Sequence, residues 1–204
     1  MHGYFTDQEG FFSMKVVAFN GSPRKGGNTE FLLSTVCGEL NREGIETEII
    51  QIGGKRLHGC TACMKCIENQ DKRCVIENDP VNEWIEKMIE ADAIIIGSPT
   101  YFADVSTEVK ALIDRAGYVS LVNGSLLSRK PGAAVIAVRR AGAIHAFDTI
   151  NHFFGINGMI TVGSSYWNVG IGREPGEVEK DGEGIATMKN LGSNMAWLLK
   201  KIAR

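Results

Sequence analysis

The sequence lacks the features that would assign it to several large classes of proteins. No apolar run approaches the roughly 20 residues needed to cross a bilayer, and residues 1–13 hold no basic segment followed by an apolar one, which excludes a secretory signal. The formal net charge of −2 gives no sign of nucleic-acid binding. We therefore expect a cytoplasmic protein with neither a membrane nor a nucleic acid as its partner.

Two common nucleotide-binding motifs are also absent. A P-loop requires Gly, four residues and then Gly-Lys-Ser/Thr, but Gly27 and Asn28 stand where the lysine and the hydroxyl are required. The dinucleotide motif Gly-x-Gly-x-x-Gly does not occur, and the second predicted strand ends in Gln51-Ile52-Gly53 instead of an acidic residue. These absences disfavour an ATP-driven enzyme and a Rossmann dehydrogenase.

The chain does contain a glycine-rich turn between an apolar run and an amphipathic one. Residues 15–20 are β-branched and aromatic, which predicts a buried strand, and residues 29–43 place apolar side chains along one helical face. Such a turn directs free N–H groups and the positive end of the helix dipole at one point, which suits a phosphate. Without a lysine or a metal, it suits a mononucleotide such as a flavin. The side chains expected to assist are Ser22, Asn28, Thr29 and either Arg24 or Lys25.

Strand-like and helical runs alternate along the rest of the chain. Residues 93–97 are apolar on both faces, as a central parallel strand should be. The alternation predicts an α/β protein with a doubly wound, five-stranded parallel sheet in a three-layer sandwich. One domain is expected over residues 14–204, and residues 1–13 are interpreted as an N-terminal extension or a cloning remnant. The predicted strands are residues 15–20, 46–52, 93–97, 131–138 and 159–164, and the helices are 29–43, 81–91, 106–118, 144–154 and 185–202.

The glycine-rich turn of residues 21–29 is called the phosphate turn below. Two further loops are expected beside it, because ligands of such sheets bind beyond the carboxyl ends of the strands. Ser98-Pro99-Thr100-Tyr101-Phe102 follows the central strand, and its two rings suit either the wall of a flat ring system or packing against the next helix. Next to a phosphate turn we favour the ring wall. Arg139-Arg140-Ala141-Gly142 follows the fourth strand, where an arginine would stabilise negative charge on a reduced flavin.

Three of the segments resemble the flavodoxin-like NADPH-dependent FMN reductase family. They are Ser22-Pro23-Arg24 with Asn28-Thr29, the loop of residues 98–102, and Lys110-Ala111-Leu112-Ile113-Asp114-Arg115. The resemblance covers almost the whole chain from Met14 and implies a flavodoxin-like fold that binds FMN. It places the FMN phosphate at Ser22, Arg24, Asn28 and Thr29, and the isoalloxazine ring at Pro99, Thr100, Tyr101 and Phe102. On the third loop, which has less glycine than is usual in the family, the candidates are Arg140 and Gly142.

Four of the five cysteines form a compact motif with spacings of two, two and seven residues: Cys60, Cys63, Cys66 and Cys74. Successive two-residue intervals place thiolates around one loop, as in the chelation of a 4Fe–4S cluster, whereas zinc sites more often use two separated pairs. The motif is similar to that of the iron–sulfur flavoproteins of anaerobes, a branch of the same family. A cluster and free or redox-active thiols stay open as equal alternatives, ahead of zinc. Cys37 is expected to be a small buried hydrophobe.

These features together predict an FMN-dependent oxidoreductase. It would pass electrons from a reduced donor such as NAD(P)H to a small acceptor or a redox partner, with a 4Fe–4S cluster as a further cofactor if the cysteines hold one. No protein side chain needs a catalytic role, because the cofactors carry the chemistry. The alternatives are a non-enzymatic flavin electron carrier and a thiol- or metal-responsive redox sensor. The resemblance also implies a homodimer or homotetramer, and residues 167–184 are expected to reach over a neighbouring subunit or to shield the flavin.

Overall fold

The central sheet is built from the apolar runs that the sequence predicts to be strands. In the computed structural model, which describes residues 14–202, every strand pair is parallel. The order is β2-β1-β3-β4-β5, with β6 also paired to β4. The predicted doubly wound parallel sheet is therefore confirmed. The strands are β1 (Lys15–Asn20), β2 (Glu46–Gln51), β3 (Ala93–Pro99), β4 (Pro131–Val138), β5 (Ile160–Thr161) and β6 (Val169–Ile171).

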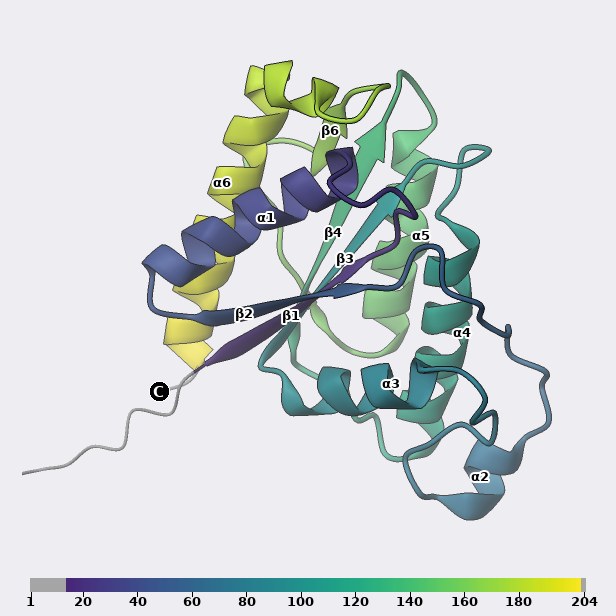
Figure 1. The fold of residues 1–204 in the computed structure, drawn as a ribbon. Helices are drawn as coiled ribbons and strands as arrows, with labels where there is room; N and C mark the ends of the chain where they lie inside the picture. The colour runs from purple at the N-terminus through teal and green to yellow at the C-terminus, as the bar shows by residue number, and fades with distance from the viewer. Residues whose placement is uncertain (1–13, 203–204) are drawn as a thin grey trace, which may run out of the picture.

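Helices cover both faces of the sheet and bury a separate core on each (Figure 1). Alternate side chains of β1 point to opposite faces. Val17 and Phe19 belong to the core under α3, α4 and α5, and Val16 and Ala18 to the core under α1 and α6. The three layers of the predicted sandwich follow from this alternation. The helices are α1 (Asn28–Arg42), α2 (Lys65–Asn69), α3 (Val81–Glu90), α4 (Thr107–Val122), α5 (Ala143–Ile156) and α6 (Gly182–Ile202), with a 3₁₀ helix η1 (Glu177–Lys180).

The strand order predicts a ligand site at the carboxyl ends of the central strands. The chain leaves β1 towards β2 on one side and returns to β3 on the other side. The loops after β1 and β3 therefore diverge, and such a switch point opens a crevice beyond the carboxyl ends of the strands. The phosphate turn and residues 98–102, predicted to form one site, both begin at this crevice.

The fifth strand position differs from the prediction of one strand over residues 159–164. Two short strands share it, because β5 pairs with Pro131 and Gly132 at the start of β4, while β6 pairs with residues 136–138 at its end. Between β5 and β6, residues 162–168 leave the sheet. A local hydrogen bond stabilises this segment, in which Ser164 Oγ donates to Asn168 Oδ1 at 2.6 Å. The prediction missed β6, η1 and α2, which are too short to show a clear period.

No helix within residues 14–202 is both long enough and apolar enough to cross a membrane. Residues 1–13, predicted to be an extension or a cloning remnant, lie outside the described part of the chain.

Candidate functional site

The glycine-rich turn after β1 is held in place by the strands on both sides of it. The Gly21 N–H donates to the Gly97 carbonyl of β3 at 2.8 Å. Asn20 Oδ1 accepts the Ser22 N–H at 3.1 Å, and Gln51 Nε2 at the end of β2 donates to the Ser22 carbonyl at 2.6 Å. Three strands thus fix the backbone of the turn before any ligand arrives.

The turn leads into α1, whose amino end no side chain caps. The first N–H groups of a helix have no partner within the helix, so here they remain available to a ligand. Asn28 and Thr29, the first two residues of α1, are both buried. Helix amides and the positive end of the dipole therefore form an anion site at this point.

A cavity of about 280 Å³ opens directly in front of this helix end. Three arginines and no carboxylate line it, so its electrostatic potential favours an anion. Seven of the residues predicted to bind the cofactor meet here. The lining residues are Ser22, Arg24, Asn28, Thr29, Pro99, Thr100, Tyr101, Ala137, Arg139, Gly172, Arg173 and Pro175.

The segment after β6, which lies within the predicted covering segment of residues 167–184, closes one side of the cavity. Arg24 Nη1 donates to the Arg173 carbonyl at 3.3 Å. Asn28 Oδ1 accepts the N–H groups of Gly176 at 3.0 Å and Val178 at 3.4 Å. The segment therefore covers the cavity of its own chain, which matches the shielding alternative. Its place depends on the pairing of β6 with β4, and no local sequence signal reports that pairing.

The loop after β3 ends in a tight, strained turn. Tyr101 and Asp104 exchange backbone hydrogen bonds of 2.8 and 3.0 Å, and the two residues between them have positive φ angles, 47° for Phe102 and 64° for Ala103. Type I′ turns require such angles and favour Asn-Gly, so Phe-Ala here costs on the order of 1–3 kcal/mol per residue. Thr149 Oγ1 of α5 anchors the turn by donating to Asp104 Oδ1 at 2.7 Å.

Phe102, predicted to flank the ring, lies outside the set of residues that line the cavity. Its side chain is fully exposed at the tip of the strained turn, with a relative exposure of 108%. Tyr101, one residue earlier, does line the cavity. The role of Phe102 at the ring therefore stays a prediction.

Arg140 and Gly142, the predicted third-loop residues, line a different cavity of about 230 Å³ between the starts of α5 and α6. Tyr166 and Trp167 form its aromatic side. Arg139, one residue earlier, lines the cavity at α1 instead. Because strand residues alternate in direction, the sequence could identify the loop but not which arginine faces the ligand. A flavin contact from Arg140 or Gly142 stays a prediction.

Gly53, two residues after the end of β2, offers a test of how closely the phosphate turn is packed. A Cβ at this position would lie 2.2 Å from the Ser22 carbonyl carbon and 2.4 Å from its oxygen. We expect Gly53→Ala to displace the turn, lower the free energy of unfolding by about 1–3 kcal/mol and weaken flavin binding. Urea unfolding and flavin fluorescence titration measure the two effects. Gly59→Ala is the control, because nothing lies within 4 Å of its Cβ; equal behaviour of the two variants would contradict the expectation.

The four loop cysteines line a second, separate pocket against α4. Cys60 and Cys63 are exposed, while Cys66 and Cys74 are partly buried. The Ala62 N–H points to Cys60 Sγ at 3.5 Å, and Ala62 and Met64 have positive φ angles of 51° and 60°. The loop thus follows the pocket with a strained backbone at Ala62 and Met64.

The ionisation of these thiols depends on their neighbours. Burial raises the pKa of Cys66, and the nearby Cys74, Cys60 and Cys63 raise it further. The Lys65 N–H lowers the pKa of Cys63 by hydrogen bonding to it. Four thiolates at one point would repel one another unless a cation compensated them.

The donor set of this pocket fits an iron–sulfur cluster, for which cysteine thiolates are the usual ligands. As placed, no three ligating side chains of residues 14–202 lie close enough together to hold a metal ion. The sequence motif brings the four cysteines to one pocket.

The two candidate sites lie at different levels along α4. Val109 packs near Gly21 of the phosphate turn, and Tyr118 borders the cysteine pocket. Nine residues of helix separate these side chains by roughly 14 Å, at about 1.5 Å per residue. The loop leaves the same sheet edge as the phosphate turn, but it then runs along α4 to α2, away from that edge (Figure 1). It does not fold back over the cavity, and the two sites share no lining residue.

Comparisons with known proteins agree with this geometry. Residues 14–174 match the family model described as NADPH-dependent FMN reductase. An iron-sulfur flavoprotein of Methanocaldococcus jannaschii is 39% identical over 198 residues, which cover 94% of this chain and 100% of the relative. An iron-sulfur flavoprotein of Methanosarcina thermophila is 33% identical over 193 residues, covering 94% of this chain and 98% of the relative.

Solved structures share the fold at low sequence identity. The WrbA-like flavodoxin of Agrobacterium tumefaciens has a TM-score of 0.65 at 15% identity, covering 93% of this chain and 98% of its own. RosB, solved with 8-demethyl-8-formylriboflavin-5′-phosphate bound, has a TM-score of 0.68 at 17% identity, covering 94% of this chain and 81% of its own. The likeness confirms the predicted flavodoxin-like, three-layer fold.

Proposed function

The chain belongs to the NADPH-dependent FMN reductase family, and on this premise we propose that it is an oxidoreductase that passes electrons from NAD(P)H through FMN to an acceptor. We further propose that the cysteine loop holds a 4Fe–4S cluster, which relays electrons to a small molecule or a protein partner. When bound, the two cofactors supply the redox chemistry, and the chain supplies position, electrostatics and access.

The cavity in front of α1 is the observation that carries the FMN proposal. The uncapped helix end suits the doubly charged phosphate, and Ser22 and Thr29 add hydroxyl donors beside it. Tyr101 and Pro99 provide a flat, apolar wall for a ring. Arg139, directly after β4, would add the positive charge that stabilises an anionic reduced flavin.

The cysteine pocket supports the cluster proposal by its chemistry. Four thiols from one loop line it, and two relatives that each align with 94% of the chain are named iron-sulfur flavoproteins. Because Cys60 and Cys63 are exposed, an acceptor or a neighbouring subunit can approach the loop from solvent.

We also propose a homodimer or homotetramer. Three aromatic side chains near the two cavities are well exposed: Phe102 at 108%, Tyr166 at 65% and Trp167 at 52%. Exposed apolar groups that cluster beside a site favour contact with a second chain. Small-angle scattering across a wide concentration range measures the assembly, and a monomeric mass throughout would refute this proposal.

Steady-state turnover tests the proposed function. FMN-loaded protein should oxidise NADPH or NADH with ferricyanide, a quinone or free flavin as the acceptor. An electron carrier would accept electrons from dithionite but would not turn over with either nucleotide. The net charge of −2 already favours the enzyme, since it provides weak steering towards a basic redox partner. Bound FMN without nucleotide turnover would leave the carrier as the better account.

A further inference from the structure

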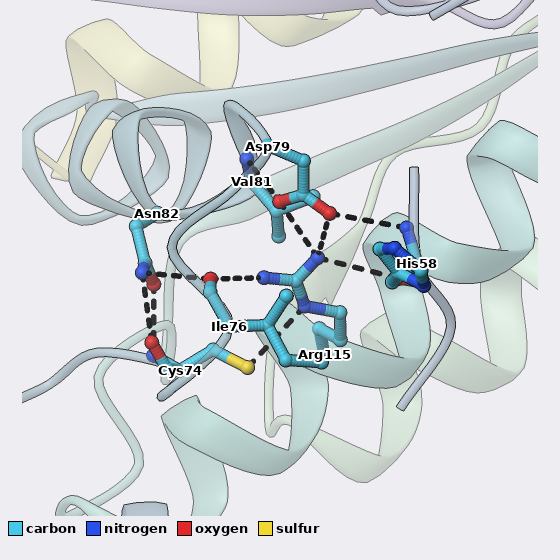
Figure 2. Close-up of polar contacts among 7 residues, drawn as sticks. All are labelled: His58, Cys74, Ile76, Asp79, Val81, Asn82 and Arg115. Carbon is cyan, nitrogen blue, oxygen red and sulfur yellow. Dashed lines mark hydrogen bonds and ion pairs between the residues drawn. The ribbon is translucent and has the colours of Figure 1, made fainter. Parts of the chain in front are cut away.

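Arg115, near the middle of α4, has an unusually complete set of contacts around the cysteine loop (Figure 2). The side chain is buried, and its Nη1 lies 2.8 and 2.6 Å from the two carboxylate oxygens of Asp79. Nη1 also donates to the His58 carbonyl at 3.3 Å, and Nη2 to the Ile76 carbonyl at 2.9 Å. Nε donates to Cys74 Sγ at 3.3 Å. Every nitrogen of the guanidinium therefore has a partner.

Burying the charge of Arg115 costs desolvation free energy, so a role beyond stability would explain why the position holds an arginine. The side chains of Arg115 and Asp79 are 0% and 1% exposed. Removing two charges from water costs several kcal/mol per ion, and an apolar pair of similar volume often stabilises a fold as well or better. Burial acts to raise the pKa of Asp79, but hydrogen bonds from Arg115 and from the N–H groups of His58 and Val81 hold it below its usual value. The Asp79 carboxylate therefore stays ionised at neutral pH.

The contacts bracket the cysteine motif. His58 precedes Cys60 by two residues, and Ile76 follows Cys74 by two residues, so one guanidinium holds the carbonyls at both ends of the loop. Asp79 strengthens the first end by accepting the His58 N–H at 3.0 Å.

Asn82 of α3 strengthens the second end of the loop. Its Oδ1 accepts the Cys74 N–H and its Nδ2 donates to the Cys74 carbonyl, both at 2.8 Å. Cys74 is thus fixed through its backbone by Asn82 and through its sulfur by Arg115, as Figure 2 shows.

We propose that Arg115 is the positioning residue of the cysteine loop: it keeps the loop closed before a cluster is loaded, and its N–H···S bond raises the reduction potential of the loaded cluster. The second part depends on the cluster of the proposed function, whereas the first part does not. A hydrogen bond to a ligating sulfur withdraws electron density and favours the more negative, reduced state. Because Asp79 balances the charge of Arg115, the directed N–H and not net charge would produce the effect.

Two variants of the full-length, FMN-bound protein separate this role from a merely structural one. Arg115→Lys keeps the charge but removes the planar set of donors. Arg115→Met with Asp79→Asn removes the buried charges together and leaves one amide oxygen, which can accept the His58 N–H that Asp79 Oδ2 accepts in the wild type. Arg73→Lys is the matched control, because this exposed arginine adjoins Cys74 in sequence.

Hydrogen exchange of residues 58–79, measured before iron is added, tests the closed loop. Both Arg115 variants should exchange faster there, with the phosphate turn unchanged, while Arg73→Lys behaves as the wild type. After anaerobic loading with iron and sulfide, a redox titration followed by electron paramagnetic resonance tests the sulfur bond. At fixed potential we expect the ratio of oxidised to reduced cluster to rise about tenfold in Arg115→Lys, which equals about 59 mV for one electron.

The outcomes distinguish the proposals. Exchange and potential equal to the wild type in both variants would overturn the role of Arg115. A wild type that takes up no iron would overturn the cluster instead, and the exchange data alone would then decide whether Arg115 closes the loop. Loss of FMN and of the circular-dichroism signal would show that Arg115→Lys does not fold. The hydrogen exchange and the reduction potential of the double variant are then compared with those of the wild type.

Discussion

Changing Asn28 and Thr29 together to alanine is expected to raise the dissociation constant of FMN by roughly tenfold to a hundredfold. Both side chains line the cavity at the uncapped end of α1. Losing hydrogen bonds to a charged phosphate costs about 1–3 kcal/mol. Asn28 has a second role, because its Oδ1 accepts the Gly176 and Val178 N–H groups. Its loss should also loosen the segment that covers the cavity.

Fluorescence titration of the apoprotein with FMN measures this effect. The control is Thr35→Ala with Asn41→Ala, which removes the same two residue types from the same helix, away from the cavity. Thr35 Oγ1 donates only to the Phe31 carbonyl of its own helix, at 2.9 Å, and Asn41 Oδ1 accepts the Thr47 hydroxyl at 3.0 Å. Unchanged FMN affinity in the Asn28 and Thr29 variant would show that the phosphate binds elsewhere.

Replacing Cys66 with alanine is expected to abolish stable cluster binding while leaving FMN bound. Cys66 shares its pocket with the other three loop cysteines, and a cluster that loses one of four thiolate ligands is open to solvent and to oxidation. The cavity in front of α1, where we propose that FMN binds, shares no lining residue with this pocket. Iron and acid-labile sulfide after anaerobic loading should therefore fall to background in this variant, with flavin content unchanged.

Cys37→Ala provides the matched control for the loop cysteine. Cys37 lies in α1 within the core, and burial raises its pKa to about 11, so it stays a neutral thiol. Its removal should leave the iron content of the protein unchanged. If Cys66→Ala keeps its iron, or if Cys37→Ala loses it, the four loop cysteines are not the ligand set.

The strands at the centre of the sheet were predictable because burial on both faces leaves a continuous apolar run. Lys15–Asn20 and Pro131–Val138 have the predicted bounds. The residues of the glycine-rich turn predicted to bind a phosphate line one cavity at the uncapped start of α1, and their role there stays a prediction. The split fifth strand was not predictable, because the Asn168 carbonyl accepts the Ile136 N–H from a distant strand. Tertiary pairing of that kind leaves no local period.

The same limit applies to the sites. Phe102 and Ala103 adopt angles that their residue types disfavour, so composition could not indicate the turn that exposes the Phe102 side chain. Arg115 lies within a segment that resembles the family, yet only the packing of α4 against the loop shows what its side chain contacts. Residues whose role depends on contacts far along the chain have to be found in the structure.

The most direct test of the account is the cofactor content of protein purified and loaded without oxygen. An absorption spectrum with flavin, iron and sulfide analysis reports both cofactors in one sample. The account predicts FMN in each chain, released on denaturation, together with a broad iron–sulfur absorbance that dithionite bleaches. Protein that folds but binds no FMN, even when FMN is added, would contradict its central claim.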